Sequence, residues 1–277
     1  MRFTEAVATA PPGSARFEAA DLARLARPTL RLLLTPGPSA PPLEDVAAAL
    51  GDRPRELFAV AAALPPDRGE RLLRLSQRPV PAGEREAAGR RLARGAFWYL
   101  AYELEPDLWD RLAGAEPIAP GLLADLPADD ARVLEVAAGS GRLTVPLIRR
   151  AAWVLAVEPC PPLRARLRER LPGVAVVAAA GHRLPCLSGW ADLVVSCAAF
   201  GPDPPLGGDE VRRELERCAR PGGTVALVSP EAPAWWREHG YAERLYPEPP
   251  ARLDTDVEAF FGPAHPPCRL LYKRVAT

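Results

Sequence analysis

The chain has 277 residues, which is enough for one large domain or for a domain with an appendage. Its 35 basic residues balance 35 acidic ones, so nothing in the charge calls for nucleic acid or an anionic membrane as a partner. The five cysteines lack metal-ligand spacing, and we find no apolar run long enough for a signal peptide or a membrane span, so we expect a cytoplasmic protein with reduced thiols and no metal.

The first part of the chain, residues 1–128, has a helical pattern that prolines interrupt. Helices are predicted over residues 42–51, 55–64 and 83–104, the last with Phe97, Leu100 and Ala101 spaced for a buried stripe. Residues 27–34 fit either a short helix or a strand. We therefore expect a mainly helical N-terminal region.

From about Ala131 onward, short apolar runs alternate with amphipathic segments. The expected strands are residues 132–137, 153–159, 174–179, 191–199 and 224–229, and the expected helices are residues 141–151, 161–171 and 209–219. Uniformly apolar strands separated by helices indicate a parallel sheet that is covered on both faces. This is a doubly wound α/β domain, and its ligand is expected at the carboxyl ends of the strands.

The turn after the first expected strand is rich in small residues, in the sequence VLEVAAGSGRLT from Val133 to Thr144. Glycines without a Cβ atom let the backbone approach a ligand closely and adopt positive φ. A dinucleotide-binding fingerprint requires glycine at positions 137, 139 and 142, where this chain has Ala, Gly and Arg. The sequence therefore departs from the dinucleotide-binding fingerprint at two of its three positions.

The segment LEVAAGSGRLT resembles motif I of the class I S-adenosylmethionine (SAM)-dependent methyltransferases, in which an acid is followed by glycines in the register of positions 137, 139 and 141. Three later segments are similar to further landmarks of that family in the same order, namely VLAVEP, LPCLSGWADLVVS and CARPGGTVALV. The resemblance covers roughly residues 131–230. It implies a Rossmann-like, mostly parallel sheet of seven strands, with SAM as cofactor and S-adenosylhomocysteine as its product.

The resemblance also implies roles for individual positions. Glu135 would orient the loop and the methionine end of SAM, while Glu158 would accept both ribose hydroxyls beside Pro159, which packs near the adenine. The other implied cofactor contacts are Ala137, Gly139 and Gly141 at the amino acid moiety, Ala180 and Gly181 at the adenine, Ser196 and Cys197 at the sulfonium, and Tyr99 or Tyr102 at the carboxylate.

Two positions depart from the family pattern. Ala137 replaces a glycine, and we expect a negative φ there because a methyl group at positive φ would cost about 1 kcal/mol or more. The acid that often touches the adenine amine is absent at positions 180–181, which leaves backbone groups or His182 for that contact. No general base stands out; His182 and His239 are the candidate catalytic residues.

We therefore expect a SAM-dependent methyltransferase domain at residues 129–277, with residues 1–128 as a cap over the active site or a homodimerisation region. The last helix and two antiparallel strands would follow Pro230. The neutral charge, and the mismatch of FGPDPP to the Asn/Asp-Pro-Pro-Tyr/Phe box of methyltransferases that modify amide or exocyclic base nitrogens, favour a small-molecule acceptor. The alternatives are an RNA or protein methyltransferase and a non-catalytic SAM-binding or scaffold protein.

Overall fold

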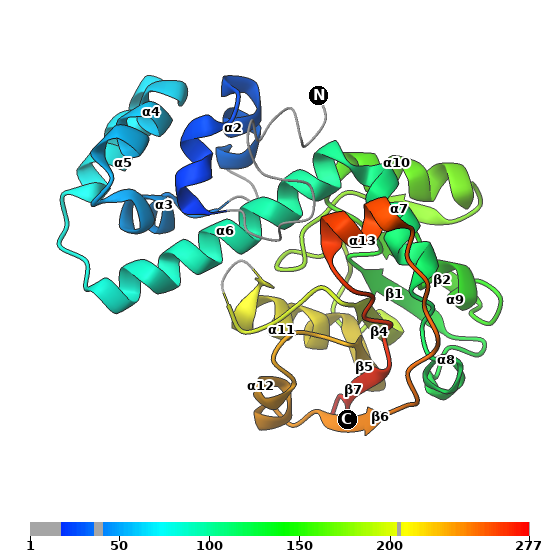
Figure 1. Cartoon of the computed structure of the whole chain (residues 1–277). Coiled ribbons are helices and arrows are strands. Elements are labelled where there is room, and N and C mark those ends of the chain that lie inside the picture. Colours follow the sequence, from blue (N-terminus) through cyan, green and yellow to red (C-terminus); the bar gives the residue numbers. More distant parts are fainter. Residues whose placement is uncertain (1–17, 36–40, 204–205, 277) are drawn as a thin grey trace. The chain divides into compact units, whose positions relative to one another are not determined.

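The computed structural model describes residues 18–35, 41–203 and 206–276, so the start of the expected N-terminal region and the end of the FGPDPP segment lie outside it. The chain divides into two compact units (Figure 1). The first comprises residues 1–106 and 255–262, and the second comprises residues 107–254 and 263–277. This division differs from the boundary expected at residue 128, because Ile118, Leu122 and Leu126 pack into the core of the second unit.

In its described residues the first unit consists of helices and their connections, with no strand. Its elements are η1 (Ala19–Arg24), α2 (Arg27–Leu34), α3 (Leu43–Leu50), α4 (Pro54–Ala63), α5 (Pro66–Ser76), α6 (Ala82–Leu104) and α13 (Thr255–Phe261). The three predicted helices appear as α3, α4 and α6, and the ambiguous segment is the helix α2. Phe97, Leu100 and Ala101 are buried along α6, as their spacing predicts.

Helix α13 belongs to the first unit although it comes late in the chain. The ring of Phe260 lies 5.5 Å from the ring of Phe97 between centroids, and the ring of Phe261 stacks at 5.8 Å on Trp98. These aromatic contacts hold residues 255–262 on α6, a long-range pairing that no local sequence pattern predicted.

The second unit contains one seven-stranded sheet in the order β3-β2-β1-β4-β5-β7-β6. The first five strands run parallel, and β7 pairs antiparallel with both β5 and β6. The predicted doubly wound, mostly parallel architecture with two antiparallel strands at its end is therefore confirmed. The strands are β1 (Arg132–Val136), β2 (Trp153–Val157), β3 (Ala175–Val177), β4 (Ala191–Cys197), β5 (Ala219–Val228), β6 (Ala242–Leu245) and β7 (Arg269–Arg274).

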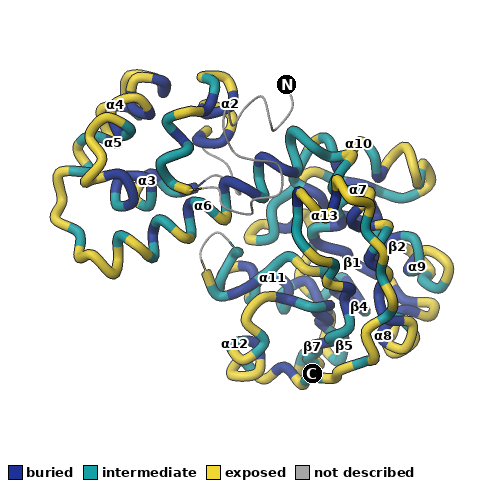
Figure 2. The backbone as a smooth tube through the Cα atoms, in the orientation of Figure 1, coloured by how far each residue is buried: buried dark blue, intermediate teal, exposed yellow. Residues whose placement is uncertain are grey.

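Helices cover both faces of this sheet. The helices of the second unit are α7 (Pro106–Ala115, of which Pro106 falls in the first unit), α8 (Pro120–Asp125), α9 (Thr144–Leu147), α10 (Pro161–Arg170), α11 (Gly208–Cys218) and α12 (Pro233–Glu238). Alternate residues of the central strands, such as Val133 and Leu134, belong to different core clusters, one with α8 and α9 and the other with α11 and α12. Figure 2 shows these strands in the colour of buried residues, as expected for a parallel sheet between two helical layers.

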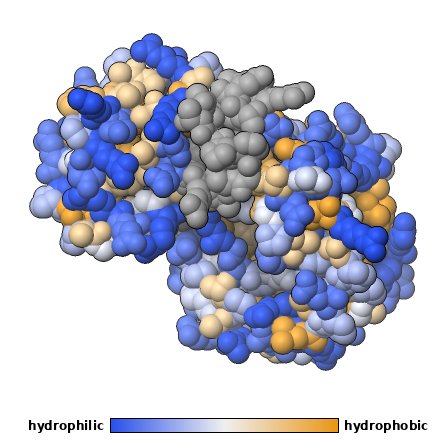
Figure 3. Space-filling model, in the orientation of Figure 1, coloured by the Kyte–Doolittle hydropathy of each residue, from blue (hydrophilic) through white to orange (hydrophobic). Residues whose placement is uncertain are grey.

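Two elements differ from their predicted bounds. Helix α9 has only four residues instead of the expected run over 141–151. Strand β5 begins at Ala219, and the register against β4 shifts between Ala191 and Leu193, so the residues of the RPGG turn form an irregular part of the strand. On the face drawn in Figure 3, hydrophilic residues prevail and hydrophobic residues are scattered among them, which is ordinary for a folded protein.

Candidate functional site

The glycine loop, residues 137–142, connects β1 to the turn before α9 at the carboxyl edge of the sheet. Its backbone has positive φ at three residues, with 59° at Ala137, 58° at Gly139 and 103° at Gly141. The expectation of a negative φ at Ala137 is therefore wrong. The Ala138 N–H donates to the Val157 carbonyl of β2 at 3.1 Å, and this bond just beyond β1 fixes the turn in which Ala137 is left-handed.

The free energy of unfolding of an Ala137→Gly variant is expected to be about 1 kcal/mol higher than that of the wild type, because glycine adopts this φ without strain. Urea denaturation measures the difference. Ala138→Gly is the matched control: Ala138 is buried and its φ is not positive, so loss of its methyl group should destabilise the protein by about 1 kcal/mol. Equal destabilisation by both variants would contradict the strain at Ala137.

The two glycines of the loop meet different surroundings. A Cβ atom on Gly141 would lie 2.8 Å from Cδ1 of Leu167 on α10, so a side chain there would require the Leu167 side chain to shift. At Gly139 the nearest atom to such a Cβ is Nε1 of Trp109 on α7, at 3.6 Å. Gly141 therefore allows the loop to pack closely against α10. Gly139 leaves the backbone without a side chain on the side that faces α7.

Glu158 follows β2 and is 4% exposed. Its Oε2 accepts the N–H of Gly139 at 2.7 Å, and its Oε1 accepts the N–H of Cys160 at 2.7 Å. The carboxylate thus links the glycine loop to the start of α10. A carboxylate can accept further hydrogen bonds beyond these two, so it also retains the capacity to bind ligand hydroxyls.

Arginines of α10 hold the backbone around this carboxylate. Arg164 donates to the carbonyls of Glu158 and Pro159 at 2.8 and 2.9 Å, and Arg170 donates to the carbonyl of Ser140 at 2.8 Å. Arg168 donates to the carbonyl of Val176 on β3 at 2.9 Å. Three of the four arginines of this helix therefore bind backbone carbonyls of β3, of the residues after β2 and of the glycine loop.

Glu135 lies at the end of β1 with 1% of its surface exposed, and its Oε2 has no hydrogen-bond partner among the described residues. Burial raises the pKa of this carboxyl to about 8, with a further contribution from the charge of Glu158, while Thr144 acts in the opposite direction. The hydroxyl of Ser196, at the end of β4, is likewise buried without a partner in the described ranges. Two unsatisfied polar side chains therefore lie at the ends of neighbouring strands, where a polar ligand would satisfy them.

Ala180 and Gly181 follow β3, the strand next to β2. A Cβ atom on Gly181 would lie 2.9 Å from the ring of Phe200, so only glycine fits there without movement. His182 is exposed directly after them. The positions expected to contact adenine are thus placed at the edge of the sheet that also carries Glu158.

An ion pair that is largely buried joins Arg142 of the glycine loop to Glu116 and was not predicted. Arg142 contacts Glu116 at 3.1 Å, and their side chains are 14% and 8% exposed. Burial raises the pKa of the neighbouring Cys197 thiol to about 11, with Arg142 acting against it and Glu135 adding to it. Cys197 at the end of β4 is therefore a neutral thiol near this pair. The sequence offered one signal for Glu116, an acid in the otherwise apolar stretch LAGAEPIAP.

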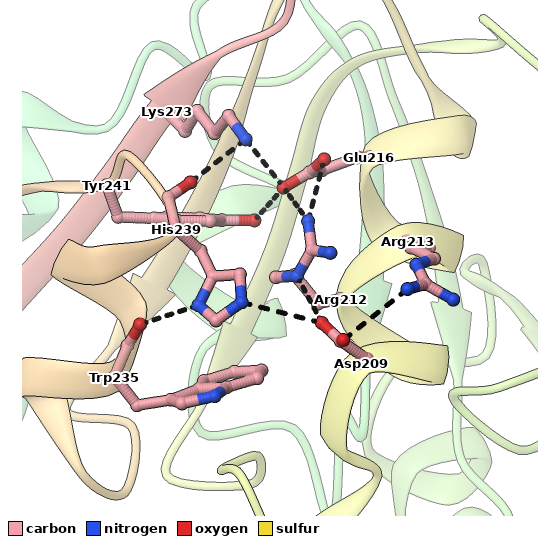
Figure 4. A network of polar contacts seen from close by, with 8 residues as sticks. All are labelled: Asp209, Arg212, Arg213, Glu216, Trp235, His239, Tyr241 and Lys273. Carbon is pink, nitrogen blue, oxygen red and sulfur yellow. Dashed lines mark hydrogen bonds and ion pairs between the residues drawn. The ribbon is translucent and has the colours of Figure 1, made fainter.

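His239 takes part in a polar network between α11, α12 and β7 (Figure 4). Its Nδ1 lies 2.8 Å from the carbonyl of Trp235, and its Nε2 lies 3.6 Å from Asp209. Glu216 in the same network accepts hydrogen bonds from Lys273 at 3.0 Å and from Tyr241 at 3.2 Å. These contacts account for the position of His239 structurally, and its role as a base stays a prediction, as does that of His182.

Tyr99 and Tyr102 lie on α6 in the first unit. The Tyr99 hydroxyl donates to the carbonyl of Leu32 at 3.5 Å, and the ring of Tyr102 packs on Trp98 at 5.8 Å. Their implied contacts with SAM stay predictions.

Within residues 18–35, 41–203 and 206–276, no three His, Cys, Asp or Glu side chains are grouped as a metal would require. None of the helices in the part of the chain that the structure describes is long and apolar enough to cross a membrane.

Comparison with known proteins finds similarity over the domain that carries this site. Residues 133–223 match the family model of a methyltransferase domain. An uncharacterized methyltransferase of Mycobacterium tuberculosis is 36% identical over 119 residues, which are 42% of this chain and 47% of that protein. An uncharacterized protein of the same organism is 31% identical over 159 residues, which are 55% of this chain and 51% of that protein. The chain spans about half the length of the curated relatives it matches.

One solved structure is similar over a larger share of the chain. It is a complex between the Haloferax volcanii Trm112 methyltransferase activator and the putative methyltransferase, and it is 17% identical with a TM-score of 0.47. The similarity covers 65% of this chain and 98% of that chain.

Proposed function

We propose that this protein is a class I SAM-dependent methyltransferase that transfers the methyl group of SAM to a small-molecule acceptor, and the match of residues 133–223 to the family model of a methyltransferase domain supports this proposal. The observation that carries the proposal is the glycine loop, whose bare, left-handed backbone is tied by the N–H of Gly139 to the carboxylate of Glu158. The unsatisfied Oε2 of Glu135 and hydroxyl of Ser196 support a polar cofactor at the same edge. The residues present therefore fit SAM.

Each group has a distinct part in the proposal. Glu158 holds the ribose, the glycine loop lies along the amino acid moiety, and Glu135 orients that moiety. SAM supplies an electrophilic methyl group on its sulfonium. The protein then needs to align the acceptor with the methyl–sulfur bond and to exclude water. Ser196 and Cys197, at the end of β4, lie next to β1 in the sheet and are proposed to face that reaction.

A small molecule is the proposed acceptor because the chain has no net charge. The N-terminal unit is proposed to cap the active site or to form a homodimer, and the protein is proposed to act in the cytoplasm.

Titration of the full chain with SAM in a calorimeter is expected to show saturable binding, and a labelled methyl group is expected to pass from SAM to a component of a metabolite extract. No heat of binding at millimolar SAM would refute the proposal. Binding without transfer to metabolites, protein or RNA would instead favour a non-catalytic SAM-binding protein. Transfer to RNA or protein would show that the acceptor is a macromolecule and not a small molecule.

A further inference from the structure

Helix α7 and Glu116, which follows it directly, reach the glycine loop at three of its residues. Trp109 faces Gly139, as described above. Asp110 reaches Ser140 through Arg170 of α10. Glu116 reaches Arg142 directly. All of these residues belong to the second unit.

The guanidinium of Arg170 joins Asp110 to the loop. Its Nη2 donates to Oδ2 of Asp110 at 2.6 Å, while its Nη1 donates to the carbonyl of Ser140 at 2.8 Å. The Asp110 side chain is 18% exposed. Burial alone would raise the pKa of Asp110, but the hydrogen bond and the charge of Arg170 hold it below its ordinary value. Asp110 is therefore ionised, and its carboxylate holds the guanidinium group of Arg170 against the glycine loop.

Glu116 fixes the other end of the loop. Its Oε2 accepts from Arg142 at 3.1 Å, and its Oε1 accepts the N–H of His265 at 2.7 Å. Both carboxylate oxygens therefore have defined partners. A buried ion pair contributes little net stability because of the cost of desolvation. We therefore infer that this pair positions Arg142 rather than stabilising the fold.

The loop needs such anchors because it carries a strained residue. Ala137 is a non-glycine residue in the left-handed region, and a strained conformation persists only when its surroundings over-determine it. Asp110 and Glu116 hold the loop on either side of Gly141, at Ser140 and at Arg142.

We propose that Asp110 and Glu116 are positioning residues, which act through Arg170 and Arg142 to hold the glycine loop in the conformation that receives SAM. This inference rests on the proposed function for its ligand. Neither acid is required to touch the cofactor.

The test compares Asp110→Asn and Glu116→Gln with Asp107→Asn in the full chain. Asp107 lies on the same helix and pairs with Arg166 of α10, but it is 77% exposed and is not bonded to the loop. Each of the first two variants is expected to weaken SAM binding about tenfold in calorimetry, the effect of one charge-assisted hydrogen bond. The control is expected to bind as the wild type does.

Hydrogen exchange of the free protein provides the second readout. Amides of a peptide spanning residues 137–144 should exchange faster in both test variants than in the wild type and the control, whereas peptides from α11 should not change. Unchanged SAM affinity in the test variants would overturn the inference. Weaker binding with unchanged exchange would also overturn it, because the acids would then act on SAM itself. If the wild type binds no SAM, the proposed function fails, while the exchange experiment still decides whether the two acids hold the loop.

Discussion

Replacing Glu158 with alanine is expected to weaken SAM binding at least tenfold, which corresponds to about 1.4 kcal/mol. The same change is expected to lower the free energy of unfolding by about 3 kcal/mol, because the carboxylate accepts two backbone N–H groups and hydrogen bonds to charged groups contribute about 1.5 kcal/mol or more each. The variant would leave Gly139 N–H and Cys160 N–H without their acceptor. Loss of the ribose contact and loosening of the glycine loop therefore act together.

A modified ligand separates these two effects. The wild type should bind S-adenosylhomocysteine more tightly than its 2′,3′-dideoxy analogue, and this preference should disappear in Glu158→Ala if the carboxylate accepts the ribose hydroxyls. Glu169→Ala is the control, since Glu169 is an exposed acid on α10. A variant that keeps both the wild-type affinity and the preference for ribose hydroxyls would show that the assignment of Glu158 is wrong.

The architecture of the second unit could be predicted because its strands carry the signal locally. The runs that became β1, β2, β4 and β5 are apolar on both faces, and each ends at a turn residue or an acid. This pattern is typical of a parallel sheet between helical layers. Glu135 and Glu158 were placed correctly at strand ends for the same reason, since a polar residue that ends an apolar run lies at the sheet edge.

The backbone of Ala137 could not be predicted in this way. An alanine carries no local preference for positive φ, and the conformation is set by bonds between the loop and β2. The boundary between the two units also depends on long-range packing. Ile118 and Leu122 precede the sheet in sequence but pack against its core, and Phe260 returns to α6 from the other end of the chain.

Glu116 and Asp110 were not found from the sequence because neither belongs to a motif. Each acquires its role from an arginine more than twenty residues away, Arg142 at 26 positions and Arg170 at 60. Spacing along the chain predicts partners within a helix or at strand ends, but it does not predict contacts between a helix and a distant loop.

The contribution of Glu135 to the stability of the free protein is expected to fall as the pH rises from about 4.5 to about 8, because Glu135 keeps its proton in the folded state over this range. Below pH 4.5 the carboxyl is protonated in both states and costs nothing. Between the two values the unfolded chain is ionised while the folded chain still binds a proton, so rising pH favours unfolding. Above pH 8 the group is ionised in both states and the loss is complete.

The loss attributable to Glu135 is at most about 5 kcal/mol, since each unit of pKa difference corresponds to about 1.4 kcal/mol. Denaturant unfolding across this pH range measures it, and Glu135→Gln should remove this part of the slope. Near pH 8.5 the variant should be more stable than the wild type by several kcal/mol, because the amide needs no ionisation in the core. If the two proteins lose stability in parallel, Glu135 is not the group that titrates.

The same proton should be released when SAM binds. Glu135 is buried beside Glu158, and in the free protein two ionised carboxylates would repel each other at the ends of adjacent strands. The cationic methionine end of SAM would compensate the second negative charge and stabilise the ionised form of Glu135. Calorimetry at pH 7 in two buffers of different ionisation enthalpy should therefore show release of up to one proton by the wild type and none by Glu135→Gln. Equal release by both proteins would place the titrating group elsewhere and would leave the neutral Glu135 carboxyl to serve the loop alone.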